Sequence, residues 1–235
     1  MNLNAIQSLT AEEVEKGQLF LIDKQLHLTS FQVVKKFRWL LKKRFDLNKL
    51  KVGHAGTLDP LATGLLVVCV GKFTKNIHQY QAQIKEYTGH FTVGATTPSY
   101  DLETEVEKTY PTNHISEELI YETAKTFEGM ISQKPPIYSA IKKDGKRLYE
   151  IAREGLTTEI KPREVQVHSF EITKIEMPKV SFKIICSKGT YIRSLAYDFG
   201  KSLNSGAYLS ELRRTKIGEF SVEDAIEIDQ MAENL

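Results

Sequence analysis

The stretch Gly53-His54-Ala55-Gly56-Thr57-Leu58-Asp59-Pro60-Leu61-Ala62-Thr63-Gly64 runs directly into the apolar residues Leu65-Leu66-Val67-Val68-Cys69-Val70. The glycines allow backbone angles and close approaches that a side chain would prevent. Pro60 disfavours helical geometry at Asp59, so this carboxylate is predicted to lie on turning or extended backbone. The apolar run is too short to cross a membrane, and its valines favour a buried strand. The sequence therefore predicts an acid on a shaped loop beside a buried strand, which is a common setting for chemistry.

The residues of this loop also permit simpler interpretations. Asp-Pro pairs and glycines form ordinary turns for purely local reasons, so a plain turn stays open. A phosphate-binding P-loop requires a different spacing of its glycines and a serine or threonine after the lysine, whereas Lys72 is followed by Phe73. Spacing therefore excludes a phosphate-cradling loop.

Composition places the chain among ordinary globular proteins. Its 235 residues suit one large domain or two small ones, and a net charge of only +2 means that a polyanionic partner must meet a local basic patch. Cys69 and Cys186 lie in apolar runs, which favours reduced thiols over a disulfide. The N-terminus has neither the charge nor the apolar core of a signal peptide, and no apolar segment is long enough to span a membrane. We expect a soluble cytoplasmic protein without membrane attachment.

Local patterns predict the elements of the first third of the chain. Residues 1–17 are polar and weakly patterned, and form either a loose lead-in or a short surface helix. Residues 19–24 are typical of a short strand. Thr29 and Gln32 then have the spacing of a capping box that opens a helix, and apolar residues recur at helical spacing as far as Phe45.

The rest of the chain alternates between strand and helix patterns. We expect a short helix over 73–80, a strand over 85–94, a surface loop over 96–113, and a helix capped by Ser116. Further on, the alternating residues 165–172 and 180–186 predict an antiparallel strand pair, and a helix is expected from Tyr191 to about Leu203. Residues 208–215 are merely amphipathic.

Two motifs carry a resemblance to a known family. Residues 53–64 closely resemble the catalytic motif of the TruB family of tRNA pseudouridine synthases, which isomerise uridine 55 in the T-loop of tRNA. The sequence Gly189-Thr190-Tyr191-Ile192-Arg193 is similar to a second signature of that family, and residues 133–150 resemble its RNA-facing segment. The resemblance covers residues 18–225. It implies an α+β pseudouridine synthase fold, with a central, mostly antiparallel mixed sheet, flanking helices and loops, and a catalytic cleft.

The resemblance also implies roles for individual residues. It implies that Asp59 is the catalytic residue, that Arg193 pairs with it, and that Tyr87 packs against the target base as a candidate for proton abstraction. By itself Tyr87 is an ordinary strand tyrosine, and a water molecule is an alternative base. Phe73 departs from the family pattern, which usually has a small residue there. The substrate-binding positions that match the family or have suitable chemistry are His54, Lys75, Tyr191 and Leu212.

The reaction explains why these residue types are needed. Pseudouridine forms when the N1–C1' bond breaks, the uracil rotates and C5 joins C1', so no redox step, cofactor or metal is required. A carboxylate either stabilises positive charge on the sugar or adds to it covalently, and both roles stay open for Asp59. An adjacent arginine keeps such an acid ionised in a closed site. The histidines and cysteines lack the spacing of a zinc site.

Basic residues gather before the Asp59 loop. Residues 35–51 contain eight cations and a single acid, Asp46. Such runs are usually solvated helix faces. This run leads into the loop on which a nucleotide would react, so we interpret Lys42, Lys43 and Arg44 as contacts to the RNA backbone. The tail from residue 219 onward has six acids and no lysine or arginine, and should stay off nucleic acid.

The expected partner is tRNA, bound through its T-arm by a monomer without an obligate protein partner. Residues 1–17 are expected to be a lead-in and residues 18–235 one catalytic domain, with no C-terminal PUA domain. A relative that works within a guide-RNA complex is a less favoured alternative. Outside this activity, an RNA-binding or tRNA-folding module without catalysis stays open, as does an N-glycosidase or nuclease, although neither a second placed acid nor a metal motif supports the latter.

Overall fold

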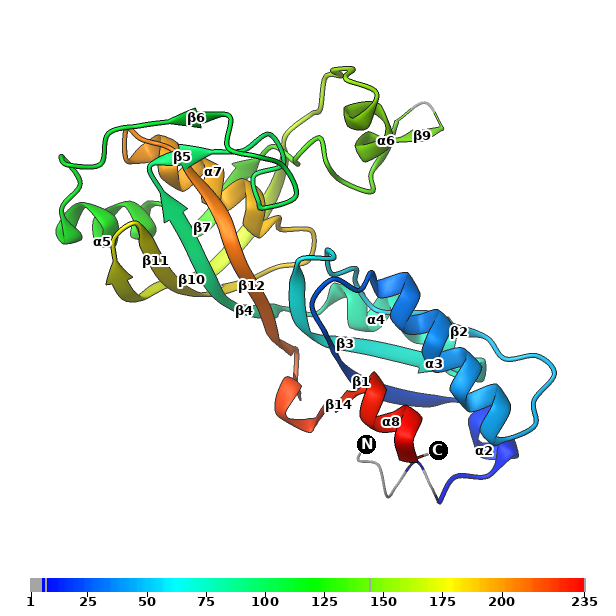
Figure 1. Ribbon diagram of the computed structural model, residues 1–235. Coiled ribbons are helices and arrows are strands. Elements are labelled where there is room, and N and C mark those ends of the chain that lie inside the picture. Colours follow the sequence, from blue (N-terminus) through cyan, green and yellow to red (C-terminus); the bar gives the residue numbers. More distant parts are fainter. Residues whose placement is uncertain (1–5, 7, 144, 235) are drawn as a thin grey trace. The chain divides into compact units, whose positions relative to one another are not determined.

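The computed structural model describes residues 6, 8–143 and 145–234, so most of the first seven lead-in residues lie outside the described part. The chain divides into two compact units (Figure 1). The first unit comprises Met1–Tyr87 and Leu212–Leu235, and the second comprises Thr88–Glu211. Strands β4 (Lys85–Val93) and β12 (Ala207–Ile217) contribute residues to both. Each unit is therefore built from segments of a mixed sheet.

The first unit combines the N-terminal third of the chain with its C-terminal tail. Its strand order is β14-β1-β3-β12, with β2 paired to β3 and β13 paired to β12. Strand β1 is antiparallel to β3, whereas the pairs β1–β14 and β3–β12 are parallel. Its elements are α2 (Ala11–Lys16), β1 (Gln18–Lys24), α3 (Ser30–Arg44), β2 (Val52–His54), β3 (Ala62–Val70), η1 (Gly71–Asn76), α4 (Ile77–Ala82), β13 (Phe220–Ser221), η2 (Val222–Asp224), β14 (Ile226–Glu227) and α8 (Ile228–Asn234).

Strands β1 and β3 are covered on both faces, which explains the unbroken apolar run of the sequence. Successive side chains point to opposite faces, so Phe20 and Ile22 join a cluster with α3 and α8, while Leu21 joins a second cluster. Along β3, Leu66 and Val68 belong to the first cluster and Leu65 to the second. Helix α4 packs against the second cluster, opposite α3 (Figure 1). The predicted buried strand is confirmed.

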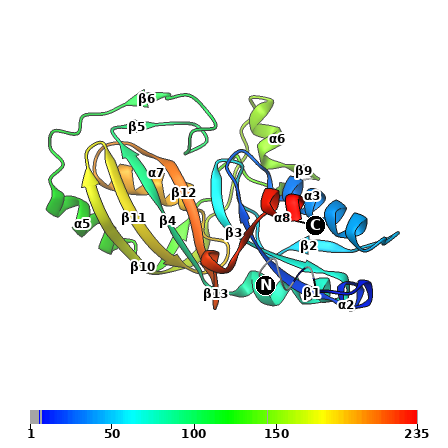
Figure 2. The same ribbon diagram turned by 60° about the horizontal axis from the view of Figure 1, so that its bottom comes forward.

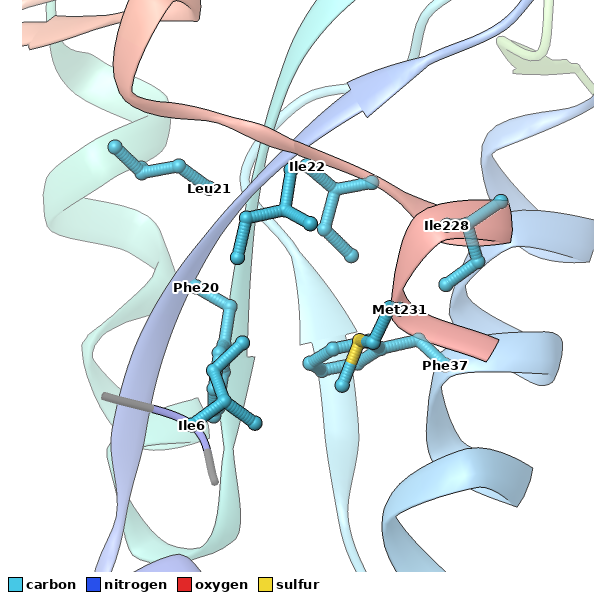
Figure 3. Close-up of a pocket in the computed structure, with 8 residues that line it drawn as sticks. Ile6, Phe20, Leu21, Ile22, Phe37, Ile228 and Met231 are labelled. Carbon is cyan, nitrogen blue, oxygen red and sulfur yellow. The ribbon is translucent and has the colours of Figure 1, made fainter. Parts of the chain in front are cut away.

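The core between β1, α3 and α8 is tightly filled. Figure 3 shows Phe20, Phe37, Ile228 and Met231 pointing toward one another from these three elements. The space between them does not admit a water molecule. Such dense packing fixes α3 against the sheet.

The predicted capping box and one of the two alternatives for the lead-in are both present. Thr29 and Gln32 form the expected capping box, in which the Thr29 amide donates to Oε1 of Gln32 at 2.7 Å. In the lead-in, the described residues include the helical alternative, α2, whose Val14 is fully buried. Phe73 is accommodated because Gly17 lies beneath it, where a Cβ would be 2.6 Å from the Phe73 amide nitrogen.

The second unit is a sheet covered by two helices. Its strand order is β12-β4-β11-β10-β7. Strand β10 is antiparallel to β11, as the alternating runs predicted, and it is also antiparallel to β7. Figure 2 shows β4, β11 and β10 side by side. Its further elements are β5 (Ala95–Thr96), β6 (Lys108–Thr109), α5 (Glu117–Thr126), β7 (Gly129–Gln133), β8 (Lys142–Lys143), β9 (Lys146–Arg147), α6 (Leu148–Arg153), β10 (Arg163–Glu176), β11 (Lys179–Cys186) and α7 (Ile192–Ser202).

Aromatic side chains fill the core of the second unit. Phe91 of β4 lies 4.4 Å from Phe182 of β11 and 5.6 Å from Phe199 of α7, measured between ring centroids. Phe170 of β10 contacts all three rings. This cluster attaches α7, which begins within the second signature, to the sheet.

The surface loop expected over 96–113 is wrong in its first part. Thr97, Ser99 and Asp101 are buried, although their polarity is typical of exposed loops. They satisfy one another: the Thr97 hydroxyl donates to the Asp101 carbonyl oxygen at 2.7 Å, and the Ser99 hydroxyl donates to the same oxygen at 3.2 Å. Polar residues can be buried when their hydrogen bonds are made internally.

Candidate active site

Asp59 lies on the loop between β2 and β3, outside any regular element and half-buried. Its neighbour Leu58 is buried, and both the amide and the carbonyl oxygen of Leu58 bond to the hydroxyl of Ser30, at 2.9 and 3.0 Å. Ser30 is the first residue of α3, so the helix holds the loop directly before the acid. Directly after it, the Pro60 carbonyl accepts the His27 amide at 2.8 Å. The backbone on both sides of Asp59 is therefore fixed.

Arg214 of β12 lies beneath the same loop, with only 1% of its surface exposed. Its Nε donates to the Leu65 carbonyl oxygen at 2.8 Å and its Nη2 donates to the Gly56 carbonyl oxygen at 3.0 Å. Gly64 is required here, because its φ is +102° and a Cβ would lie 2.3 Å from the Arg214 carbonyl oxygen. A single guanidinium thus connects the start of the loop with the strand that follows it.

A second cation is buried beside the loop. The Lys24 ammonium donates to the carbonyl oxygens of Leu28 and Gln25, at 2.7 and 3.0 Å, and lies 3.5 Å from that of Pro60. Burial lowers the pKa of Lys24 from its ordinary 10.5 to about 8, and the negative charge of Asp59 opposes this shift. The charge of Asp59 therefore acts on the titration of Lys24.

His54 ends β2, at the start of the loop. Burial lowers its pKa; hydrogen bonding to the Gly56 backbone opposes the shift, and the charge of Arg214 adds to it. The imidazole is consequently neutral at pH 7. A neutral, half-buried ring is compatible with the substrate-binding role expected of His54, which stays a prediction.

Three other predicted residues lie in the first unit. Leu212 of β12 pairs in register with Ala62, three residues after Asp59, and its side chain is buried. Lys75 is exposed in η1, and Tyr87 is buried in β4. The structure thus brings Leu212 and His54 to the Asp59 loop, and places Lys75 and Tyr87 on separate elements of the same unit.

Arg193 lies in the first turn of α7, in the second unit. Its guanidinium donates to the carbonyl oxygens of Ser99 and Tyr138, at 3.2 and 2.9 Å, and its Nε lies 3.6 Å from Oδ2 of Asp101. Both charged side chains are buried. The predicted pairing of Arg193 with Asp59 joins residues of different units and stays a prediction.

Tyr191, the N-cap residue of α7, is held by a buried glutamine. The Gln133 side chain accepts the Tyr191 amide at 2.8 Å and donates to its carbonyl oxygen at 3.1 Å. The guanidinium of Arg163 lies 4.9 Å from the Tyr191 ring centroid. The ring is half-buried, in a setting that suits stacking against a base.

The predicted backbone contacts lie at the end of α3. Lys42, Lys43 and Arg44 form its last turn, where Lys43 and Arg44 are exposed and Lys42 is half-exposed. Their charges also complement the negative end of the helix dipole.

Sequence reasoning missed four residues that support these positions: Arg214, Lys24, Asp101 and Gln133. Each acts through a partner far along the chain, such as Arg214 with Gly56. The only available signal was proximity to motifs, since Gln133 opens the segment that resembles the RNA-facing part of the TruB family.

Comparison with known proteins finds matches along most of the chain. Residues 42–192 match the model of the TruB family pseudouridylate synthase N-terminal domain, and residues 193–235 match that of the tRNA pseudouridylate synthase B C-terminal domain. The chain is 60% identical to tRNA pseudouridine synthase B of Flavobacterium johnsoniae, over 97% of this chain and 100% of that protein. It is 50% identical to the protein of the same name from Chloroherpeton thalassium, over 93% and 90% of the two chains.

Solved structures show the same fold. A chain from an H/ACA RNP bound to a substrate RNA containing 2'-deoxyuridine aligns with a TM-score of 0.67 at 28% identity. A chain from a Cbf5-Nop10-Gar1 complex aligns with a TM-score of 0.68 at 29% identity. Each alignment covers 93% of this chain but only 53% and 55% of those chains, respectively.

The fold is that of the pseudouridine synthases, as the sequence predicted. The chain belongs to the TruB family of pseudouridylate synthases. No helix in the described part of the chain has the length and apolar character needed to cross a membrane.

Proposed function

We propose that this protein isomerises uridine 55 in the T-loop of tRNA to pseudouridine, with Asp59 as the catalytic carboxylate. One structural observation carries the proposal: Asp59 is held on a loop whose backbone is fixed by Ser30 on one side and His27 on the other. Preorganisation of this kind is what a reacting acid needs. The names of its high-identity relatives support tRNA as the substrate.

The proposed reaction rearranges bonds within the uridine itself. Cleavage of N1–C1' leaves positive charge on the sugar, which Asp59 stabilises or captures at C1'. The uracil then turns so that C5 bonds to C1', the bond to Asp59 breaks if one formed, and the C5 proton moves to solvent or to a base while N1 gains a proton. Because the product is an isomer of the substrate, the proposed reaction consumes no co-reactant.

The remaining predicted residues divide between charge control and base binding. We assign Arg193 as the counter-charge of Asp59, and Tyr87 as the candidate that receives the C5 proton. A flipped base needs aromatic and apolar surfaces around it, which His54, Tyr191 and Leu212 would supply. Lys75 adds a cation to this set, and Lys42, Lys43 and Arg44 would contact the phosphates.

The proposed partner and location follow from the substrate. The protein would bind the T-arm directly, as a monomer without an obligate protein partner, and would work in the cytoplasm, where tRNA is found. The buried, reduced thiols of Cys69 and Cys186 are compatible with that compartment. The solved relatives, by contrast, were captured in assemblies with Nop10 or with substrate RNA.

The test is formation of pseudouridine in an unmodified tRNA transcript, mapped by position, with wild type and Asp59→Asn compared. We expect product at uridine 55 with wild type alone. Asp224→Asn is the matched control, since it removes an equal charge from an exposed position in the first unit and should leave activity intact. Absence of product with wild type, despite RNA binding, would favour a folding module, and released uracil or cut RNA would favour a glycosidase or nuclease.

A further inference from the structure

Helix α3 presents two exposed aromatic side chains that the proposed reaction does not use. Phe31 is 69% exposed and Trp39 is 56% exposed. Together with Lys35, Arg38 and Lys42 they occupy positions i, i+4, i+7, i+8 and i+11, which lie on one side of a helix. These five residues are called the outer α3 face. Large aromatic groups left in water on one face commonly mark a binding surface.

The charged residues of the outer α3 face are all positive. Helix α3 contains no acidic residue, and the outer α3 face has three cations around its aromatic groups. The ammonium of Lys43 lies 5.2 Å from the Trp39 ring centroid, which orients the indole and adds a fourth cation. Lys36, on another side of the helix, is already paired with Asp229 of α8. Charge complementarity therefore points to a polyanion.

The apolar side of α3 is not available to a membrane. Val33, Phe37 and Leu41 are buried in the core of the first unit. A helix that binds a lipid surface must bury its apolar side in that surface, and α3 has already buried it in protein. Aromatic groups interleaved with cations are, in contrast, the pattern of surfaces that stack on unpaired bases and hold the phosphates beside them.

Helix α3 also starts beside the Asp59 loop. Ser30, next to Phe31, bonds to the backbone of Leu58, which directly precedes Asp59. Trp39 lies eight residues beyond Phe31, or about 12 Å along the axis at 1.5 Å per residue. An RNA chain that places a base at Asp59 can therefore continue along α3.

We propose that the outer α3 face binds the RNA substrate, with Trp39 stacking on an unpaired base while Lys35, Arg38 and Lys42 contact neighbouring phosphates. This inference rests on the proposed function and adds a stacking contact outside the reacting uridine. Since a base–aromatic stack contributes about 1–3 kcal/mol, its loss should weaken binding by about tenfold.

Trp39 is the sole tryptophan of the sequence, so the intrinsic fluorescence of the protein reports on this surface. The wild-type chain is titrated with an unmodified T-arm stem-loop transcript while tryptophan emission and RNA binding by band shift are followed together. We expect emission to be quenched in step with binding. Trp39→Ala should bind about tenfold more weakly, and Trp39→Phe should recover most of the affinity. Tyr121→Ala is the matched control, because Tyr121 is an exposed helical aromatic among glutamates.

Two outcomes would overturn the inference. One is binding of the stem-loop without any change in emission and with equal affinity for Trp39→Ala. The other is a change in emission with phosphatidylserine vesicles but not with RNA. Pseudouridine formation is measured on the same preparations: product without a Trp39 response refutes the inference alone, whereas a Trp39 response without product refutes the proposed reaction alone.

Discussion

Each unit of the described molecule buries an arginine, and the two arginines have different surroundings. Arg214, in the first unit, donates to the carbonyl oxygens of Gly56 and Leu65, on either side of the Asp59 loop. Arg193, in the second unit, also binds two carbonyl oxygens but in addition lies 3.6 Å from the carboxylate of Asp101. We infer that Arg214 organises backbone, whereas Arg193 is placed to act on carboxylates.

The largest expected effect concerns Arg193. If Arg193 holds Asp59 ionised and oriented, Arg193→Met should lower the single-turnover rate of pseudouridine formation by about 10³-fold, the size seen when one preorganised charge-stabilising group is removed. The dissociation constant for tRNA should change by no more than about threefold. Rapid-quench kinetics and a binding titration on the same variant separate the two effects. Equal losses in rate and affinity would make Arg193 a binding residue.

For Arg214 the predicted effect is on stability, a cost that Arg193→Met shares because Arg193 also donates to two carbonyl oxygens. Arg214→Met leaves two buried carbonyl oxygens without donors, at about 1–3 kcal/mol each, so the free energy of unfolding should fall by about 4 kcal/mol. The neighbouring Arg213→Met is the control: Arg213 forms a partly exposed pair with Asp23, and its loss should cost about 1 kcal/mol. Urea unfolding measures both. Similar losses for the two variants would contradict the proposed role of Arg214 in organising the loop.

The sequence predicted the parts of the molecule that depend on neighbouring residues. The capping box at Thr29, the buried strand after Gly64 and the antiparallel pair β10–β11 all follow from local patterns, and all are present. Pro60 and the neighbouring glycines predicted that Asp59 lies on a loop, whereas its catalytic role comes from family resemblance and stays a prediction. What could not be predicted was long-range: the Arg214 contact with Gly56 spans 158 positions of sequence separation, and no local pattern encodes it.

The sequence also failed to predict the burial of polar residues, again because a partner distant in sequence is involved. Residues 96–113 have a loop-like composition, yet Asp101 is buried: its carboxylate lies 3.6 Å from Nε of Arg193 and accepts the Glu103 amide at 2.9 Å, and its backbone carbonyl accepts the hydroxyls of Thr97 and Ser99. Composition reports the average setting of a residue type, whereas burial of a charge depends on its partners.

The pH dependence of stability tests the effect of a third buried cation, Lys24. Its pKa is lowered to about 8 by burial, from 10.5, so below pH 8 the folded protein bears the full cost of a buried ammonium. Between pH 8 and 10.5 the folded state releases this proton before the unfolded state does, and stability should rise with pH. Relative to Lys24→Met, wild type should gain up to about 3 kcal/mol across this window, measured by urea unfolding.

A second variant tests the link between Lys24 and the reactive acid. The charge of Asp59 raises the pKa of Lys24, so Asp59→Asn should lower that pKa further and start the rise in stability at a lower pH. Cys69, whose pKa burial raises to about 11, ionises in both backgrounds and cancels in the comparison. If stability rises over the same pH range in Asp59→Asn and in wild type, the charge of Asp59 does not affect the pKa of Lys24.

The smallest effect is expected for the cations at the end of α3. These side chains are exposed or half-exposed, whereas Arg193, Arg214 and Lys24 are buried. Replacing Lys42, Lys43 and Arg44 by glutamine should weaken tRNA binding by about tenfold at low salt, because each lost phosphate contact removes counterion release. The slope of log affinity against log salt should flatten by about 0.7–0.9 per contact. Substituting the exposed Lys125, Lys174 and Lys179 of the second unit removes the same charge and should leave the slope unchanged. If both triple variants flatten the slope equally, binding follows net charge, and the end of α3 has no special place in the RNA site.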